Sequence, residues 1–91
     1  MASELEIVFT DTALKQFRAI VKGSKNTAKR ILKKIEAYAT DPDNNYDIKT
    51  LKGQSGNRLR LRIGSYRIIF KRESERIIIT LIKHRKEAYN D

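Results

Sequence analysis

The chain has 91 residues, a net charge of +9 and no cysteine, which describes one small domain built without disulfides. Since only one histidine is present, a structural zinc site with four His or Cys ligands is not expected. No apolar run approaches the ~20 residues that span a bilayer, and the first residues lack the pattern of a signal peptide. We therefore expect a single domain over residues 1–91, located in the cytoplasm, with no cofactor and no membrane contact.

The positive charge is concentrated in the second half of the chain. Residues 1–47 carry 8 Lys and Arg against 7 Asp and Glu, whereas residues 48–91 carry 12 against 4. Nearly all of the excess, +8 of +9, therefore lies after residue 47. A concentrated basic field attracts polyanions, most often nucleic acid, although an acidic protein or an anionic membrane surface would also satisfy it.

The first half predicts one strand and then two helices. Residues 5–9 are rich in β-branched and aromatic side chains, and Thr10 or Asp11 then supplies an N-cap for a helix of about three turns. Apolar residues recur at helical spacing up to Val21. After a break at Gly23-Ser24, the same spacing predicts a second helix that carries an apolar stripe.

The second helix is expected to begin near Asn26 or Thr27 and to end before Pro42, which disfavours helix in the residue before it. Residues 48–52 lead into a loop with two glycines, at positions 53 and 56. The spacing of these glycines matches neither a P-loop nor a dinucleotide-binding fingerprint.

Residues 58–72 predict a β-hairpin with two different faces. In its first strand apolar and basic side chains alternate, so that Leu59, Leu61 and Ile63 oppose Arg58, Arg60 and Arg62. Gly64-Ser65 supplies the turn, and in the second strand Tyr66, Ile68 and Phe70 alternate with Arg67, Ile69 and Lys71. One face is expected to build the core and the other to present a row of guanidinium groups.

A last strand is expected over residues 76–83, which are apolar on both faces near Ile77 and Ile79, as suits a strand inside a sheet. The predicted order is β-α-α-β-β-β, an α+β class in which a two-helix hairpin packs on a mostly antiparallel sheet. The arginine row has two interpretations at this point. It is either a solvated outer face of that sheet or a surface for phosphates, which guanidinium groups bind in bidentate fashion.

Four segments, taken together, resemble the RelE/ParE superfamily of toxins from type II toxin–antitoxin systems, and the RelE branch in particular. They are Lys49-Thr-Leu-Lys-Gly53, Leu59-Arg-Leu-Arg62, Gly64-Ser-Tyr-Arg-Ile-Ile-Phe70 and His84-Arg-Lys-Glu-Ala-Tyr89. The resemblance covers essentially the whole chain. It implies the RelE-like fold and a metal-independent endoribonuclease that cleaves messenger RNA in the ribosomal A site and so inhibits translation.

The resemblance also implies a set of catalytic residues: Arg58, Arg60, Arg67, His84, Arg85 and Tyr89. A supporting role in RNA binding falls to five further basic residues: Lys49, Lys52, Arg62, Lys83 and Lys86. Several guanidinium groups can stabilise a pentavalent phosphorane without a metal. Arginine is a poor base, however, and the family often has lysine at the positions of Arg58 and Arg60, so the identity of the base stays open.

His84 is a candidate for acid–base work, because histidine alone titrates near neutral pH without perturbation, and we expect its strand to border the arginine face. The alternative is a histidine that bonds a backbone group or faces solvent. Tyr89 is expected either to stack on a base and contact the phosphate or to cover an edge of the core.

Two other functions share this fold and charge. The ParE branch acts on DNA gyrase and cleaves no RNA, and a degenerate relative would bind RNA without cleaving it. Each toxin interpretation implies an acidic, RelB-like antitoxin that folds over the basic surface, with DNA bound only through that antitoxin. The RelE interpretation adds the ribosome and its mRNA as partners.

Overall fold

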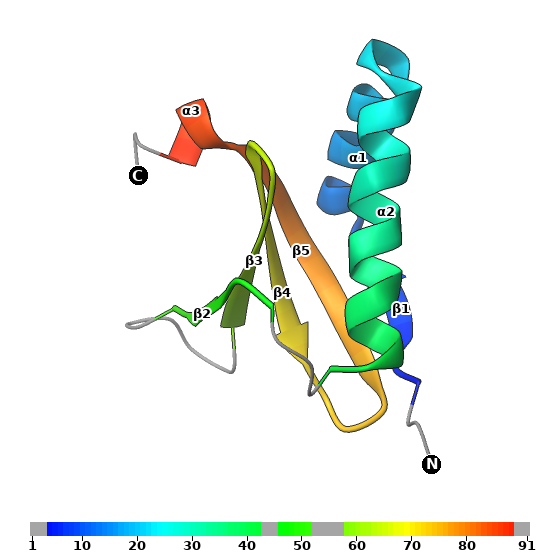
Figure 1. The fold of residues 1–91 in the computed structure, drawn as a ribbon, viewed down its shortest axis with the longest axis vertical. Coiled ribbons are helices and arrows are strands. Elements are labelled where there is room, and N and C mark those ends of the chain that lie inside the picture. The colour runs from blue at the N-terminus through cyan, green and yellow to red at the C-terminus, as the bar shows by residue number, and fades with distance from the viewer. Residues whose placement is uncertain (1–3, 43–45, 52–57, 89–91) are drawn as a thin grey trace.

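The computed structural model describes residues 4–42, 46–51 and 58–88, which form two layers (Figure 1). Helices α1 and α2 lie side by side on one face of a five-stranded sheet. The elements in chain order are β1 (Glu6–Phe9), α1 (Asp11–Gly23), α2 (Lys25–Thr40), β2 (Ile48–Thr50), β3 (Arg58–Ile63), β4 (Tyr66–Arg72), β5 (Arg76–His84) and α3 (Arg85–Ala88). This is the expected α+β arrangement, with two additional short elements, strand β2 and helix α3.

The strand order in the sheet is β1-β5-β4-β3-β2, in which β1 runs parallel to β5 and all other neighbours are antiparallel. The long α-helical hairpin between β1 and the rest of the sheet makes the parallel pair possible, because parallel strands need a crossover connection. Strand β5 lies inside the sheet, as its apolar sequence on both faces predicted.

Hydroxyl side chains cap the N-termini of α1 and α2. The Thr10 Oγ1 accepts a hydrogen bond from the backbone N–H of Ala13, at 3.2 Å, and the Ser24 Oγ accepts one from the N–H of Thr27, also at 3.2 Å. Ser24 also donates its own N–H to the carbonyl of Ile20, so this one extended residue ends α1 and caps α2. The second helix therefore begins at Lys25, one or two residues before the predicted start.

The core lies between the helices and the sheet. Its fully buried side chains come from α2 (Ile31, Ile35, Tyr38) and from the strands (Ile68, Phe70, Ile77, Ile79). The Tyr38 ring meets the rings of Phe70 and Tyr46 edge to face, with centroids 5.2 and 5.4 Å apart. None of the described helices is long and apolar enough to cross a membrane.

A β-bulge in β5 decides which residues face the helices near its end. Pairing with β4 passes from Phe70–Ile79 to Ile69–Leu81, which leaves Thr80 as an extra residue. The Thr80 hydroxyl donates to the carbonyl of Ile69 at 3.1 Å. Because side chains alternate along a strand, one extra residue reverses the facing of every residue that follows.

Candidate functional site

The basic residues of the hairpin gather on the face of the sheet that α1 and α2 leave uncovered. Among the described residues, seven cationic side chains share this outer face: Lys49 on β2, Arg58, Arg60 and Arg62 on β3, Arg67 and Lys71 on β4, and Lys83 on β5. Leu59, Leu61 and Ile63 point the other way, into or against the core. The predicted division of the hairpin into an apolar and a basic face is confirmed. Lys71 belongs to this face without having been assigned to the site, although the same alternation had placed it there.

Three of the cations form a row across the sheet. Arg62 is paired with Arg67, and Arg67 is paired with Lys83 on the next strand. Directly paired residues on neighbouring strands have Cβ atoms about 4.5–5.5 Å apart, and like charges at this spacing are destabilising. The alignment of three like charges therefore works against the fold and suits an anionic ligand.

Asp47, a carboxylate that the sequence analysis did not single out, lies at the edge of the row. Asp47 Oδ2 lies 3.9 Å from Arg62 Nε, and both side chains are about half exposed. Solvent screens such a pair, so it offsets little of the repulsion within the row.

Two further cross-strand pairs of basic residues lie on the same face. Lys49 on β2 is paired with Arg60 on β3, and Arg58 is paired with Lys71. The Nε atom of Arg60 is buried and has no hydrogen-bond partner among the described residues. Since buried donors are nearly always bonded, this N–H is suited to a ligand oxygen.

At the end of the row, three arginines surround a small hollow. A cavity of about 140 Å³ is lined by Arg62, Arg67 and Arg85 together with the turn residues Gly64 and Ser65. We call this hollow the arginine niche. Arg85 reaches it because its backbone N–H donates to the carbonyl of Ser65 at 2.7 Å, which docks α3 on the β3–β4 turn. Gly64 adopts a φ of +57°, a left-handed conformation that favours glycine.

His84 lies on the opposite face of the sheet from the arginine row. It is paired with Tyr66, and the two rings meet edge to face, with centroids 5.1 Å apart at 89°. Its Nδ1 accepts a hydrogen bond from the backbone N–H of Lys86 at 3.3 Å. Strand β5 borders the arginine face as expected, since Lys83 is paired with Arg67, but the bulge at Thr80 turns His84 itself toward the helices.

The remaining predicted site residues are distributed as follows. The exposed Lys49 lies on the outer face of β2, and the exposed Lys86 lies on α3. Lys52 and Tyr89 fall outside the described residues. Within the described part of the chain, no three His, Cys, Asp or Glu side chains gather as a group that would hold a metal. The structure thus brings Arg58, Arg60, Arg67 and Arg85 to one side of the sheet.

Comparison with protein families assigns this chain to a class of protein, the toxins of type II toxin–antitoxin systems. The family model described as the ParE toxin of the type II toxin–antitoxin system parDE matches residues 7–89, and the chain belongs to this family. It is a member of the RelE/ParE superfamily, which confirms the resemblance seen in the sequence.

Its relatives include RelE-like proteins. Toxin RelE3 from Methanocaldococcus jannaschii is 28% identical over 86 residues, which cover 94% of this chain and 97% of that protein. The RelB–RelE antitoxin–toxin complex from Methanococcus jannaschii has a TM-score of 0.70 at 29% identity, covering 91% of this chain and 95% of the solved chain. The YoeB dimer from Staphylococcus aureus shares the fold, with a TM-score of 0.75 at 17% identity over 89% of this chain and 97% of that chain.

Proposed function

We propose that this toxin is a metal-independent, ribosome-dependent endoribonuclease that cleaves messenger RNA in the cytoplasm and so inhibits translation. The observation that carries the proposal is the row Arg62–Arg67–Lys83, which ends in the arginine niche. A cationic row that repels itself is useful to a protein that binds a phosphate there, and the fourth cation, Arg85, converges on the same place.

The proposed reaction uses the RNA's own 2′-hydroxyl. Its oxygen forms a bond to the neighbouring phosphorus, the bond from phosphorus to the 5′-oxygen breaks, and that oxygen takes up a proton. The product strands end in a 2′,3′-cyclic phosphate and a 5′-hydroxyl. Arg62, Arg67 and Arg85 stabilise the doubly negative phosphorane between these two events, which is electrostatic catalysis by preorganised donors.

Proton transfer is assigned to groups beside the row. The Asp47 carboxylate, at the edge of the row beside Arg62, is suited to accept the proton of the 2′-hydroxyl. The sequence had suggested His84 as general acid. From its place on the helix side, His84 reaches the leaving oxygen only if the RNA passes around the β3–β4 turn. Its catalytic role stays a prediction.

An acidic antitoxin is the proposed protein partner. Between the cations, the outer face exposes half-buried apolar residues of β4 and β5, namely Ile69, Ile78 and Leu81. An apolar centre with a basic rim fits an acidic amphipathic segment that folds on binding. The RelE relative from Methanococcus jannaschii was solved with its RelB antitoxin, and we propose a RelB-like partner here, with DNA bound only through it.

The test is induced expression of the wild type beside an Arg67→Ala, Arg85→Ala double variant, followed by mapping of 5′ ends on translated messages. Codon-phased cleavage inside reading frames with the wild type alone would support the proposal. Toxicity with intact messages would contradict it. The variant must accumulate to the wild-type level, so that loss of cleavage reports the site and not the fold.

A second candidate is inhibition of DNA gyrase, which the match to the ParE family model favours. The same expression experiment separates the two. A gyrase inhibitor would arrest growth, relax plasmid supercoiling and leave messages whole. A relative that only binds RNA would show no toxicity and a salt-dependent RNA affinity.

A further inference from the structure

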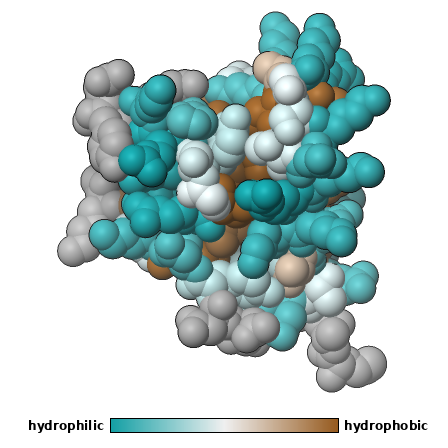
Figure 2. Space-filling view, turned by 45° about the horizontal axis from the view of Figure 1, so that its top comes forward, coloured by the Kyte–Doolittle hydropathy of each residue, from teal (hydrophilic) through white to brown (hydrophobic). Residues whose placement is uncertain are grey.

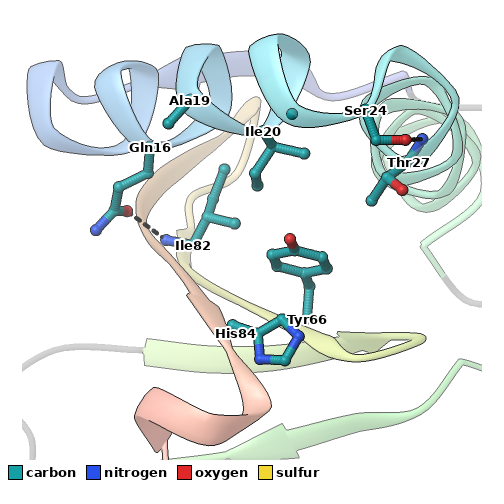
Figure 3. Close-up of a pocket in the computed structure, with 9 residues that line it drawn as sticks. Gln16, Ala19, Ile20, Ser24, Thr27, Tyr66, Ile82 and His84 are labelled. Atoms are coloured by element: carbon teal, nitrogen blue, oxygen red, sulfur yellow. Dashed lines mark hydrogen bonds between the residues drawn. The ribbon is translucent and has the colours of Figure 1, made fainter.

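A cleft opens between the helices and the sheet at the end of the molecule that carries the β3–β4 turn. Its volume is about 580 Å³, within the range of small-molecule sites, and Tyr66, Ile82 and His84 line its sheet side while Gln16, Ile20 and Thr27 line its helix side (Figure 3). Seen from this end, hydrophobic and weakly polar residues come to the surface in the middle of a hydrophilic frame (Figure 2).

Two aromatic rings and two hydroxyl groups give the cleft its chemistry. Tyr66 and His84 are half buried and stand at 89° to one another, so each presents a surface against which a flat ligand can pack. The Tyr66 hydroxyl points toward the junction of α1 and α2 (Figure 3). Tyr66 and Thr27 both line the cleft, and a hydroxyl can donate a hydrogen bond to a ligand or accept one from it.

The cleft continues to the arginine niche around the β3–β4 turn at the end of the hairpin. A second hollow, of about 280 Å³, shares Thr27, Tyr66 and His84 with the cleft. It shares Gly64 and Ser65 with the niche. The β3–β4 turn therefore lies between a site lined by guanidinium groups and a site lined by aromatic rings. A nucleotide carries a phosphate and a flat base on two sides of one ribose, which matches this arrangement.

We propose that the cleft is a nucleobase subsite. An RNA strand with its phosphate in the arginine niche passes over Gly64–Ser65, and the adjoining base packs against Tyr66 and His84, within reach of the Tyr66 and Thr27 hydroxyls. Proteins recognise unstacked RNA bases in this way, on aromatic faces beside a cationic groove. The inference rests on the proposed function only in assigning RNA phosphate to the niche.

Proton NMR tests the inference directly, because the chain has one histidine and its imidazole C–H signals are therefore unambiguous. The probes are adenosine 5′-monophosphate and ribose 5-phosphate, which carries a hydroxyl at C1 in place of the adenine base. The ring current of a stacked adenine is expected to move the His84 signals upfield, whereas ribose 5-phosphate is expected to produce no upfield movement. The absence of upfield movement with adenosine 5′-monophosphate would overturn the proposal.

An Ala19→Trp variant provides the matched control. Ala19 lines the cleft, is exposed and lies on α1, so a larger side chain fills the cleft without removing a charge or a core contact. We expect this variant to lose the upfield movement and to keep its affinity for ribose 5-phosphate. If the variant retained the full movement with adenosine 5′-monophosphate, the base would lie elsewhere and the subsite would be disproved.

Binding affinities for short RNA strands show whether the base in the cleft comes from RNA or from a free nucleotide. A short oligoadenylate is expected to bind about tenfold tighter than an abasic strand of the same length, and Ala19→Trp is expected to remove this preference. Equal affinity of the wild type for both strands would overturn the subsite. Neither readout depends on cleavage, so messages that stay whole in cells would refute the nuclease and leave the base subsite standing.

Discussion

Arg62 and Arg67 face each other across the β3–β4 hairpin as a directly paired couple on the outer face of the sheet. Arg62 and Arg67 also line one cavity with Arg85. Most cross-strand pairs stabilise a sheet, but two guanidinium groups in this position repel. The hairpin therefore gives up some stability at the place where we propose that a phosphate binds.

Replacing Arg62 should separate stability from binding. We expect Arg62→Ala to leave the free energy of unfolding unchanged or to raise it by up to about 0.5 kcal/mol, because the like-charge contact is removed. RNA affinity should fall, and the slope of log affinity against log salt should decrease by about 0.7, the value for one phosphate contact on a single strand. Urea denaturation and binding titrations over a range of salt measure both. Arg18→Ala, at an exposed position on α1, is the matched control and should leave the salt slope close to that of the wild type.

The guanidinium group of Arg85 should contribute to cleavage, and its backbone N–H to the fold. The bond that docks α3 runs from the Arg85 backbone N–H to the Ser65 carbonyl, so Arg85→Ala is expected to keep the fold. Cleavage of messages should fall by about 10²–10³-fold if this guanidinium stabilises the phosphorane. Arg85→Lys should recover only part of the rate, because an ammonium group lacks the planar fork of donors. Thermal melting checks the fold, and an alanine variant with wild-type cleavage would remove Arg85 from the mechanism.

Two substitutions can show whether the role of His84 is structural or catalytic. Its Nδ1 accepts a hydrogen bond from the N–H of Lys86 in the first turn of α3. Asparagine also accepts such a bond well at the N-cap of a helix. Because the imidazole lies on the helix side, we expect His84→Asn to retain most of the cleavage and His84→Ala to lose more of it. If both variants lost cleavage to the same extent, His84 would be an acid or base of the reaction, as the sequence had suggested.

Gln16 should contribute to stability through one hydrogen bond. Strand β1 ends at Phe9, and beyond it the Ile82 N–H of β5 donates to Gln16 Oε1 at 2.6 Å. We expect Gln16→Ala to lower the free energy of unfolding by about 1 kcal/mol, since the N–H is then left without this partner in a partly buried place. Gln16→Glu retains an acceptor and should lose less. Urea denaturation measures the difference, and equal losses in the two variants would contradict the assignment.

Gly64 should be sensitive to any side chain. Its φ of +57° is left-handed, and a Cβ there would meet no atom within 4 Å, so the cost of Gly64→Ala is one of backbone conformation. We expect a loss of about 1–2 kcal/mol in the free energy of unfolding. Gly64→Asn should lose less, because asparagine tolerates this conformation better. Thermal denaturation tests the order, and an alanine variant as stable as the wild type would show that the turn can change its conformation.

The hairpin was predictable because its signals are local. Alternation of apolar and basic residues from Arg58 to Ile63 determines which side chains share a face once the segment is a strand. Glycine at position 64 marks the turn for the same kind of reason. The basic face, the α+β class and the family resemblance therefore follow from the sequence alone.

The end of β5 could not be predicted in this way. Counting alternation from Ile77 and Ile79 would place Lys83 among the core residues and His84 on the arginine face. The bulge at Thr80 reverses both placements. Contacts between distant segments stabilise the bulge. The Thr80 hydroxyl donates to the carbonyl of Ile69, and the Thr80 carbonyl accepts a hydrogen bond from the Thr10 hydroxyl at 3.3 Å.

Which arginines meet in the arginine niche could likewise not be predicted from the sequence, because it depends on the tertiary structure. Arg85 is 18 residues from Arg67 in the sequence, and the β4–β5 pairing together with the bond from its N–H to Ser65 brings its side chain to the hollow. The sequence by itself determined the longer helices and strands, the basic strand face and the resemblance to a class of protein, because these depend on periodicity and charge along the chain. The tertiary structure decided which cations meet and on which side His84 lies, because a single bulge and one backbone hydrogen bond join segments that periodicity treats separately.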